Sequence, residues 1–198
     1  MQQSKPRNQS DKKQSNLTQG TLRIIGGQMR GRKLQFATVD GLRPTLDRIR
    51  ETLFNWLIAD IHQAHCLDLF AGSGALGFEA ISRGAVQLTF VEKSPKVVID
   101  LKKNCQLLAI ENAKIVNQSF EKFLHTNQQQ FNLVFLDPPF GQAMLTDIEA
   151  RLTPHLMPGA LIYVEHEKNT ADQVDFSWDT VKSKQTGSLV YSLYRYGA

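Results

Sequence analysis

The sequence predicts an α/β fold: a doubly wound, mostly parallel sheet of seven strands, preceded by a small β-hairpin and a helix. Three observations lead to this prediction. From about residue 63 onward, short apolar runs alternate with segments of helical periodicity, which is typical of parallel strands with helices on both faces. A glycine-rich turn follows the first of these runs. The last two runs have no helix between them, so the C-terminal strand must be antiparallel.

The first part of the chain precedes this alternation. Residues 1–20 are polar and basic with almost nothing apolar, so we expect a disordered tail followed by a single domain over 21–198. Two short apolar runs, 22–25 and 33–36, flank a glycine-containing segment and predict a hairpin. After Pro44 an apolar residue recurs at helical spacing, which predicts a helix from Thr45 to about Ile61. Residues 21–62 then form the hairpin and helix, and 63–198 the sheet.

The sheet-bearing part follows in a regular order. In chain order we expect strand 66–70, a helix ending near 82, strand 87–91, helix 95 to about 108, strand 114–116, helix 120 to about 126, strand 133–136, helix 144–152 and strand 160–165. The last two strands lie within 178–196, on either side of the turn Thr186-Gly187-Ser188.

Composition and charge limit the function classes. Lys and Arg number 23 against 19 Asp and Glu, a net charge of +4, which favours an anionic partner without specifying it. Two cysteines, Cys66 and Cys105, are too few for a disulfide framework and too far apart for a zinc motif. The five histidines show no ligand spacing, so no metal site is expected. No apolar run reaches the length of a membrane span, and we expect a cytoplasmic monomer that does not associate with membranes.

A glycine loop follows the first strand of the sheet. Gly72, Gly74 and Gly77 satisfy the spacing G-x-G-x-x-G, which lets a ligand approach the backbone and packs the next helix against the strand. Glu92 ends the second strand, 20 positions after Gly72, where a carboxylate can accept hydrogen bonds from both ribose hydroxyls of an adenosine group. The pattern therefore predicts a nucleoside-containing cofactor.

Asp68 helps to decide which cofactor this is. Nicotinamide dinucleotides use the same loop with a pyrophosphate over the helix N-terminus. Asp68 stands at the strand end just before the loop, where it would repel a pyrophosphate but attract the α-ammonium of a methionine group. The acid favours S-adenosylmethionine, and a nicotinamide-dependent oxidoreductase remains the alternative from another enzyme class.

The segment Asp137-Pro138-Pro139-Phe140 follows the strand 133–136 and should face the cofactor from the same edge of the sheet. A base amine attacks a methyl group poorly because its lone pair is delocalised, and acceptors beside its N–H bonds favour the tetrahedral geometry that attack requires. The Asp137 carboxylate and the Pro138 carbonyl are such acceptors, and the prolines restrict where they point. Phe140 offers a flat face on which an extruded base can stack.

Together these residues resemble the class I methyltransferases that act on amino groups, and more narrowly the RsmD family of 16S ribosomal RNA guanine-N2 methyltransferases. The resemblance covers about 22–196 and is most specific at 26–32, 43–55, the Asp68 loop and 137–140. It implies S-adenosylmethionine as cofactor and, as substrate, 16S rRNA within the small ribosomal subunit or its assembly intermediate. The cofactor contacts that we carry over are Asp68, Phe70, Gly72, Gly74, Glu92, Lys93, Ser119 and Phe120. The segment Asn117-Gln118-Ser119-Phe120 lacks the acid that many such enzymes place near the adenine.

The N-terminal block is basic, which fits an RNA substrate. Between residues 21 and 50 there are seven cationic side chains against two acidic ones. We expect RNA phosphates to contact six of them: Arg30, Arg32, Lys33, Arg43, Arg48 and Arg50. Alternatives remain open: methylation of DNA adenine or of a protein glutamine by the same chemistry, or a non-catalytic RNA-binding module that has kept the fold.

Overall fold

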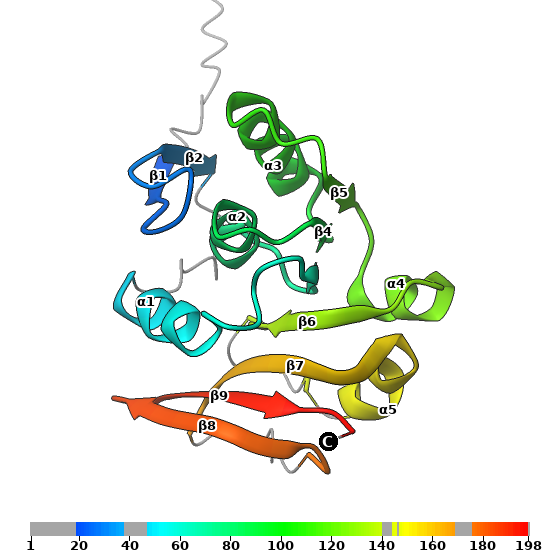
Figure 1. Ribbon diagram of the computed structural model, residues 1–198. Coiled ribbons are helices and arrows are strands. Elements are labelled where there is room, and N and C mark those ends of the chain that lie inside the picture. Colours follow the sequence, from blue (N-terminus) through cyan, green and yellow to red (C-terminus); the bar gives the residue numbers. More distant parts are fainter. Residues whose placement is uncertain (1–18, 38–46, 140–143, 146, 169–175, 198) are drawn as a thin grey trace, which may run out of the picture.

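The computed structural model describes residues 19–37, 47–139, 144–145, 147–168 and 176–197 (Figure 1). A small sheet pairs β1 (Gln19–Arg23) with β2 (Lys33–Ala37) in antiparallel orientation, which confirms the predicted hairpin. A larger sheet holds seven strands in the order β5-β4-β3-β6-β7-β9-β8. The predicted α/β fold with a seven-stranded, mostly parallel sheet is therefore confirmed.

The order of the strands shows where a ligand site should lie. The parallel strands are β3 (His65–Asp68), β4 (Gln87–Val91), β5 (Ala113–Val116), β6 (Phe131–Leu136) and β7 (Leu156–Glu167). The chain winds outward from β3 to β5, then returns to β6 beside β3 and winds outward the other way. At this reversal the carboxyl ends of β3 and β6 are neighbours, and open α/β sheets bind ligands in the crevice at such a point.

The last two strands complete the sheet as the sequence predicts. β8 (Asp179–Thr186) and β9 (Leu189–Arg195) form an antiparallel hairpin. β9 enters the sheet between β7 and β8 and is antiparallel to β7 as well. With no helix to carry the chain back across the sheet, antiparallel pairing is the arrangement that a short turn permits.

Helices cover both faces of the large sheet (Figure 1). α1 (Asp47–Trp56), α2 (Ala75–Ser82) and α3 (Pro95–Leu107) share one hydrophobic core with the hairpin. α4 (Phe120–Thr126) and α5 (Ile148–Leu152), which is followed by the 3-10 helix η1 (Thr153–His155), border the core on the other face. The sheet is therefore doubly wound, as expected.

Two helices are shorter than their periodicity predicts. α1 ends at Trp56 rather than near residue 61, and the buried side chains Leu57 and Ile61 lie in the turns that follow. α5 begins at Ile148 rather than 144, because Asp147 has a φ of 60°, in the left-handed region, which a right-handed helix cannot include. In both cases apolar residues at helical spacing are buried by a loop instead. The predicted start of α1, at 45–46, lies outside the described residues.

β7 is longer than expected, with twelve residues from Leu156 to Glu167 instead of 160–165. Pro158 and Gly159 normally interrupt a strand. Here the register against β6 shifts between Phe131 and Leu133, and Gly159 adopts a φ of 77°. An irregularity with three extra residues on β7 therefore accommodates Pro158 and Gly159 without ending the strand.

Several other expectations concern the whole chain. Within the described ranges no helix is long and apolar enough to cross a membrane, and no cluster of three or more His, Cys, Asp or Glu is arranged to hold a metal ion. Cys66 and Cys105 are both buried free thiols, and burial raises the pKa of Cys105 to about 11. The predicted tail, apart from residues 19 and 20, lies outside the part that the structure describes.

Candidate active site at the carboxyl edge of the sheet

The glycine loop connects β3 to α2 in the way its spacing predicts. Gly72 and Gly74 have φ values of 48° and 79°, in the left-handed region that favours glycine. A Cβ atom on Gly77 would lie 2.3 Å from the ring of Phe90 on β4. The helix can therefore approach the sheet only because residue 77 has no side chain.

Asp68 ends β3 beneath this loop and acts on the helix that follows. Gly74, the N-cap of α2, has no side chain with which to accept a helical N–H. Asp68 accepts one instead, since its Oδ2 lies 3.1 Å from the backbone nitrogen of Gly77. Asp68 therefore caps one of the free N–H groups in the first turn of α2, as an N-cap side chain usually does.

The electrostatics of Asp68 follow from its burial. Its side chain is 2 % exposed, and desolvation raises its pKa to about 8 despite the hydrogen bond from Gly77, with smaller contributions from the charges of Asp137 and Glu92. Asp68 therefore binds a proton at neutral pH in the free protein. A cation placed beside it would favour the ionised form.

Glu92, just after β4, points its carboxylate at the glycine loop. Oε2 accepts from the backbone nitrogen of Gly72 at 3.0 Å, and Oε1 accepts from that of Ser94 at 2.7 Å. Each carboxylate oxygen has a second lone pair, and Glu92 is partly exposed. The side chain is held in one orientation and retains the capacity to accept two ribose hydroxyls.

Asn117 is a site residue whose role the sequence analysis missed. Its side-chain nitrogen donates to the carbonyl oxygens of Glu92 at 2.8 Å and Lys93 at 3.1 Å. The bonds tie the end of β5 to the end of β4 and so support the Glu92 segment. An amide directly after a strand at the carboxyl edge was the available signal.

Two aromatic rings border the same edge. Phe70, which follows β3, and Phe120, at the start of α4, have ring centroids 5.1 Å apart at an interplanar angle of 52°. Both are partly exposed, so a flat ring can pack beside them. Ser119 is the N-cap of α4, where its Oγ accepts from Lys122 at 3.4 Å, and the side chain of Lys93 is exposed.

The Asp-Pro-Pro segment meets these residues from β6. Asp68 pairs with Phe135 across the two strands, which brings the end of β3 close to Asp137, and the charge of Asp137 is one cause of the raised pKa of Asp68, after desolvation. Pro138 is buried, while Asp137 and Pro139 are partly buried. Phe140 lies outside the described residues. The structure therefore brings Asp68, Glu92 and Asp137 to one corner of the carboxyl edge.

The basic residues of the N-terminal block do not share one environment. Arg30, Arg32 and Lys33 are exposed on the hairpin, and Arg48 is exposed on α1. Arg32 also donates from Nη2 to the carbonyl oxygen of Leu107, near the end of α3, at 2.9 Å. Arg43 lies outside the described residues.

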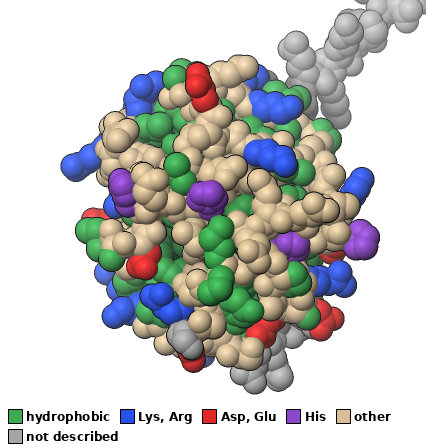
Figure 2. Space-filling model, turned by 45° about the vertical axis from the view of Figure 1, so that its right-hand side comes forward, with side chains coloured by type: hydrophobic (Ala, Val, Ile, Leu, Met, Phe, Trp, Pro, Cys, Tyr) green, Lys and Arg blue, Asp and Glu red, His purple; other side chains and the backbone are tan. Residues whose placement is uncertain are grey.

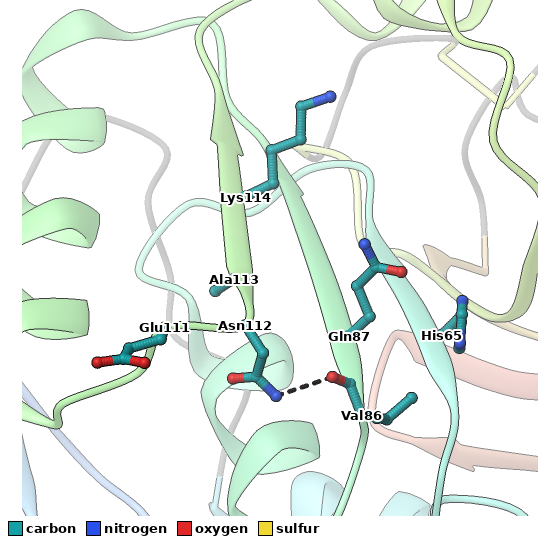
Figure 3. A pocket seen from close by; sticks show the side chains of 7 residues that line it. All are labelled: His65, Val86, Gln87, Glu111, Asn112, Ala113 and Lys114. Carbon is teal, nitrogen blue, oxygen red and sulfur yellow. Dashed lines mark hydrogen bonds between the residues drawn. The ribbon is translucent and has the colours of Figure 1, made fainter.

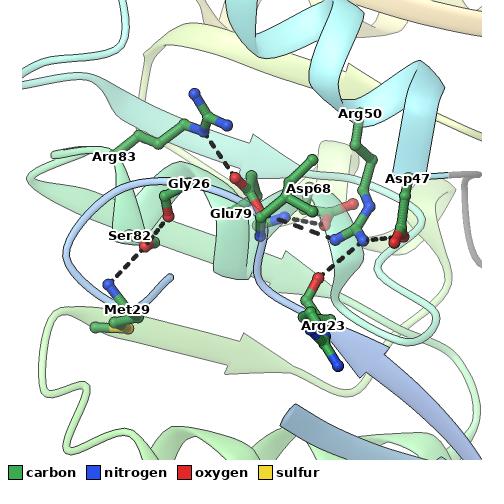
Figure 4. A network of polar contacts seen from close by, with 11 residues as sticks. Arg23, Gly26, Met29, Asp47, Arg50, Asp68, Glu79, Ser82 and Arg83 are labelled. Carbon is green, nitrogen blue, oxygen red and sulfur yellow. Dashed lines mark hydrogen bonds and ion pairs between the residues drawn. The ribbon is translucent and has the colours of Figure 1, made fainter. Parts of the chain in front are cut away.

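For Arg50 the expectation of phosphate contact is wrong. Its side chain is completely buried and lies between α1, the hairpin and α2 (Figure 4). Nη2 donates to Asp47 at 2.6 Å and to the carbonyl oxygen of Arg23 at 2.9 Å, and Nη1 lies 3.8 Å from Glu79. Since the guanidinium is enclosed by these partners, it contributes to the interior and not to an RNA-binding surface.

Glu79, on α2, is the centre of this buried network. It is fully buried and accepts from the backbone nitrogen of Ile25 at 2.9 Å and from Nε of Arg83 at 2.7 Å. One turn away, the hydroxyl of Ser82 donates to Gly26 and accepts from Met29 (Figure 4). These contacts dock the hairpin on the helix that begins at the glycine loop.

A hollow of about 430 Å³ lies elsewhere, at the starts of the strands (Figure 3). Its lining includes His65, Gln87 and Ala113, the first residues of β3, β4 and β5. These positions are at the amino edge of the sheet, opposite Asp68 and Glu92. The hollow is therefore not part of the candidate active site.

Comparison with known proteins agrees with this geometry. The family model described as "Conserved hypothetical protein 95" matches residues 22–195. The protein named "Ribosomal RNA small subunit methyltransferase D" from Haemophilus influenzae is 49% identical over 182 residues, which cover 89% of this chain and 94% of that one. The region that the family model matches includes the turn and second strand of the hairpin as well as most of the sheet.

Solved structures show the same fold. The structure of the Escherichia coli protein yhhF, described as a candidate methyltransferase, is 47% identical with a TM-score of 0.82, and the match covers 90% of this chain and 99% of that one. A candidate methyltransferase solved in complex with SAH shares the fold at 14% identity, with a TM-score of 0.67 over 83% of this chain and 53% of that one. The glycine loop, the acids and the Asp-Pro-Pro segment lie at one edge of the sheet, and the family model spans almost all of the chain. This chain therefore belongs to the conserved hypothetical protein 95 family.

Proposed function

We propose that this chain transfers a methyl group from S-adenosylmethionine to the exocyclic N2 amine of a guanine in 16S rRNA, within the small ribosomal subunit or its assembly intermediate. The observation that carries the proposal is the meeting of the Asp137-Pro138-Pro139 segment with the Asp68 and Glu92 loops where the winding of the sheet reverses. The name of the Haemophilus relative, a ribosomal RNA small subunit methyltransferase, supports methyl transfer to this class of RNA.

The residues at this edge fit an adenosine cofactor with a methionine end. Glu92 is oriented by two backbone N–H groups so that the ribose hydroxyls can bind its remaining lone pairs. Phe70 and Phe120 border the place for the adenine ring, with Lys93, Ser119 and Phe120 at its rim. Asp68, buried behind Gly72 and Gly74, suits a cationic α-ammonium, reached directly or through water, and disfavours a pyrophosphate.

When bound, S-adenosylmethionine supplies an electrophilic methyl group on a positively charged sulfur. The protein's part is to position the acceptor amine and to make its lone pair available. Asp137 and the carbonyl of Pro138 accept the two N–H bonds, which favours the tetrahedral nitrogen that attacks the methyl carbon. Because the alkylated nitrogen is strongly acidic, its proton can pass to Asp137 or to water. Phe140 supplies a stacking surface for the extruded base.

The RNA surface is proposed to include the exposed cations of the hairpin and α1, namely Arg30, Arg32, Lys33 and Arg48, with Arg43 beside them in sequence. Figure 2 brings the right-hand side of Figure 1 forward, and on this face the Lys and Arg side chains are scattered among acidic and histidine side chains. The hairpin, in contrast, concentrates three cations within residues 30–33. We further propose that the enzyme acts as a cytoplasmic monomer.

The test compares ribosomal RNA from cells with and without the protein. Mapping of methylated nucleotides should reveal one N2-methylguanine in 16S rRNA that disappears with the protein. Purified protein and labelled S-adenosylmethionine should then restore it on particles that lack the modification. Transfer of the label to DNA adenine or to a protein glutamine instead, with 16S rRNA unchanged, would refute the proposal.

A further inference from the structure

A second buried carboxylate lies beside the Asp-Pro-Pro segment, near the end of β7. β6 and β7 are parallel, with Leu136 opposite Val164. One step further in the same register places Asp137 beside Glu165. Neighbouring strands are about 4.8 Å apart, so the two acids occupy one corner of the carboxyl edge.

Glu165 is held on the same face of the sheet as the residues that precede Asp137. The hydroxyl of Tyr163 donates to Oε1 of Glu165 at 2.6 Å, as two side chains on one face of a strand can do. The ring of Tyr163 lies 6.5 Å from that of Phe135, two residues before Asp137. Tyr163 is completely buried and Glu165 is 2 % exposed.

The electrostatics show that these groups share one region. Burial raises the pKa of Tyr163 well above its ordinary value, and the charge of Glu165, its hydrogen bond and the charge of Asp137 raise that pKa further. The hydroxyl therefore stays protonated and continues to donate to Glu165. This hydrogen bond fixes the position of Oε1 of Glu165 and thereby also sets the direction in which Oε2 points.

Guanine presents two neighbouring donors on its Watson–Crick edge, the ring N1–H and the exocyclic N2 amine. Adenine presents an unprotonated N1 at the same position, which a carboxylate repels. Enzymes that extrude a base read it through hydrogen bonds to this edge. Two carboxylates side by side therefore match guanine and oppose adenine.

We propose that Glu165 is a specificity-determining residue, which accepts the N1–H of the target guanine while Asp137 accepts from its N2 amine. This inference rests on the proposed function and adds to it how the base is chosen. Glu167, two residues further along the same face, is partly exposed, so Glu165 lies about 7 Å of strand from the surface.

The experiment replaces the target guanine by 2-aminopurine, which keeps the amine at position 2 but has an unprotonated N1. Single-turnover methyl transfer is measured on particles with either base at the mapped position. The wild type should prefer guanine strongly. In Glu165→Gln, the amide can donate to the N1 of 2-aminopurine, so the preference should fall about tenfold or more, with slower transfer to guanine and faster transfer to 2-aminopurine.

Matched variants separate this role from a structural one. Glu167→Gln makes the same change on the same strand and should leave the preference at its wild-type value. Tyr163→Phe removes only the hydroxyl that orients Glu165 and should reduce the preference severalfold, which keeps the inference testable if Glu165→Gln does not fold. An equal loss on both bases in Glu165→Gln, or an unchanged preference in Tyr163→Phe, would overturn the inference. Absence of transfer by the wild type to guanine itself would instead contradict the proposed function.

Discussion

Two groups of charged residues lie along α2 and have different surroundings. At its amino end, Glu92 binds the backbone of the glycine loop and remains partly exposed. In its second half, Glu79 is fully buried and faces Arg50 and Arg83. Both carboxylates accept backbone N–H groups, from Gly72 and Ile25 respectively.

The difference between these groups is what remains available to a ligand. The partners of Glu79 enclose it within the protein, and burial makes any unpaired charge there costly. Glu92 keeps lone pairs and solvent access at the edge where the sheet reverses. The same side chain therefore serves structure in one place and is suited to binding in the other, and the distinction comes from burial and partners rather than residue type.

The largest expected effect is on stability. Glu79→Ala leaves Arg50 buried without its acidic neighbour on α2 and removes the partner of Arg83 and of the Ile25 N–H. The free energy of unfolding should fall by about 3–5 kcal/mol, the usual cost of breaking a buried ion pair. Urea denaturation measures it, with Lys103→Ala, which breaks an exposed pair with Asp100, as the control that should change little. A loss no larger than the control's would refute the structural role of the network.

The next effect is on the chemical step. Asp137→Ala should lower the rate of methyl transfer about a hundredfold or more, because it removes one preorganised acceptor from the amine. Affinity for S-adenosylmethionine should stay near the wild-type value, since the change acts on the transition state. Single-turnover transfer to unmodified particles gives the rate, and Asp137→Asn, which keeps an acceptor oxygen, should lose less. A wild-type rate in Asp137→Ala would exclude the mechanism.

Glu92→Ala tests the cofactor side of the comparison. Loss of the hydrogen bonds to the ribose should weaken S-adenosylmethionine binding by about 1.5–3 kcal/mol, the range for hydrogen bonds to a charged group. Isothermal titration calorimetry measures the change, and Glu111→Ala at the opposite edge of the sheet is the matched control. Equal affinity in the Glu92 and Glu111 variants would remove Glu92 from the site.

Asp68 should make stability depend on pH. Its pKa is about 8 in the folded protein against 3.8 ordinarily, so between these values the folded state binds a proton that the unfolded state lacks. The free energy of unfolding should therefore fall as pH rises from about 4 to about 8. In Asp68→Asn, which can still accept from Gly77, this part of the slope should vanish. An identical profile in the variant would show that Asp68 does not titrate in this range.

The smallest effect concerns the exposed cations. Replacing Arg30, Arg32 and Lys33 together by Gln should lower RNA affinity and flatten its dependence on salt, because fewer counterions are released on binding. Arg50 is buried, so it should contribute nothing to that slope, and Lys182→Gln, at an exposed position on β8, serves as a single-charge comparison. Affinity measured between low and moderate salt decides the matter, and an unaltered slope in the triple variant would move the RNA surface elsewhere.

Sequence and structure agree best where a local pattern has one solution. The strand 87–91 and the helix 120–126 were predicted with their observed bounds. The close packing expected at Gly77 is present, because Phe90 leaves no room for a Cβ atom. The proposed cofactor contacts Asp68 and Glu92 were predicted to lie close together from their positions after neighbouring strands, and the structure places both beside the glycine loop. Parallel strands bring their carboxyl ends to one edge, so position in the chain already implies proximity.

Agreement fails where distant residues decide. The charge of Arg50 suggested a surface role, whereas its contacts with Arg23, across 27 positions, and with Glu79, across 29, place it inside. Apolar spacing suggested longer helices at 45–61 and 144–152. The left-handed φ of Asp147 prevents the second helix from beginning before Ile148. The apolar residues Leu57, Ile61 and Leu145 are buried, but they lie outside the helices.

The amino-acid sequence by itself determined the alternation of strands and helices, the glycine loop and the residue types at the strand ends, because each depends on neighbours a few positions away. Which charges are buried, how β7 continues through Pro158 and Gly159, and the position of Glu165 beside Asp137 all depend on contacts between distant segments. Burial and strand register arise from packing between segments far apart in the chain, so no short window of sequence contains them.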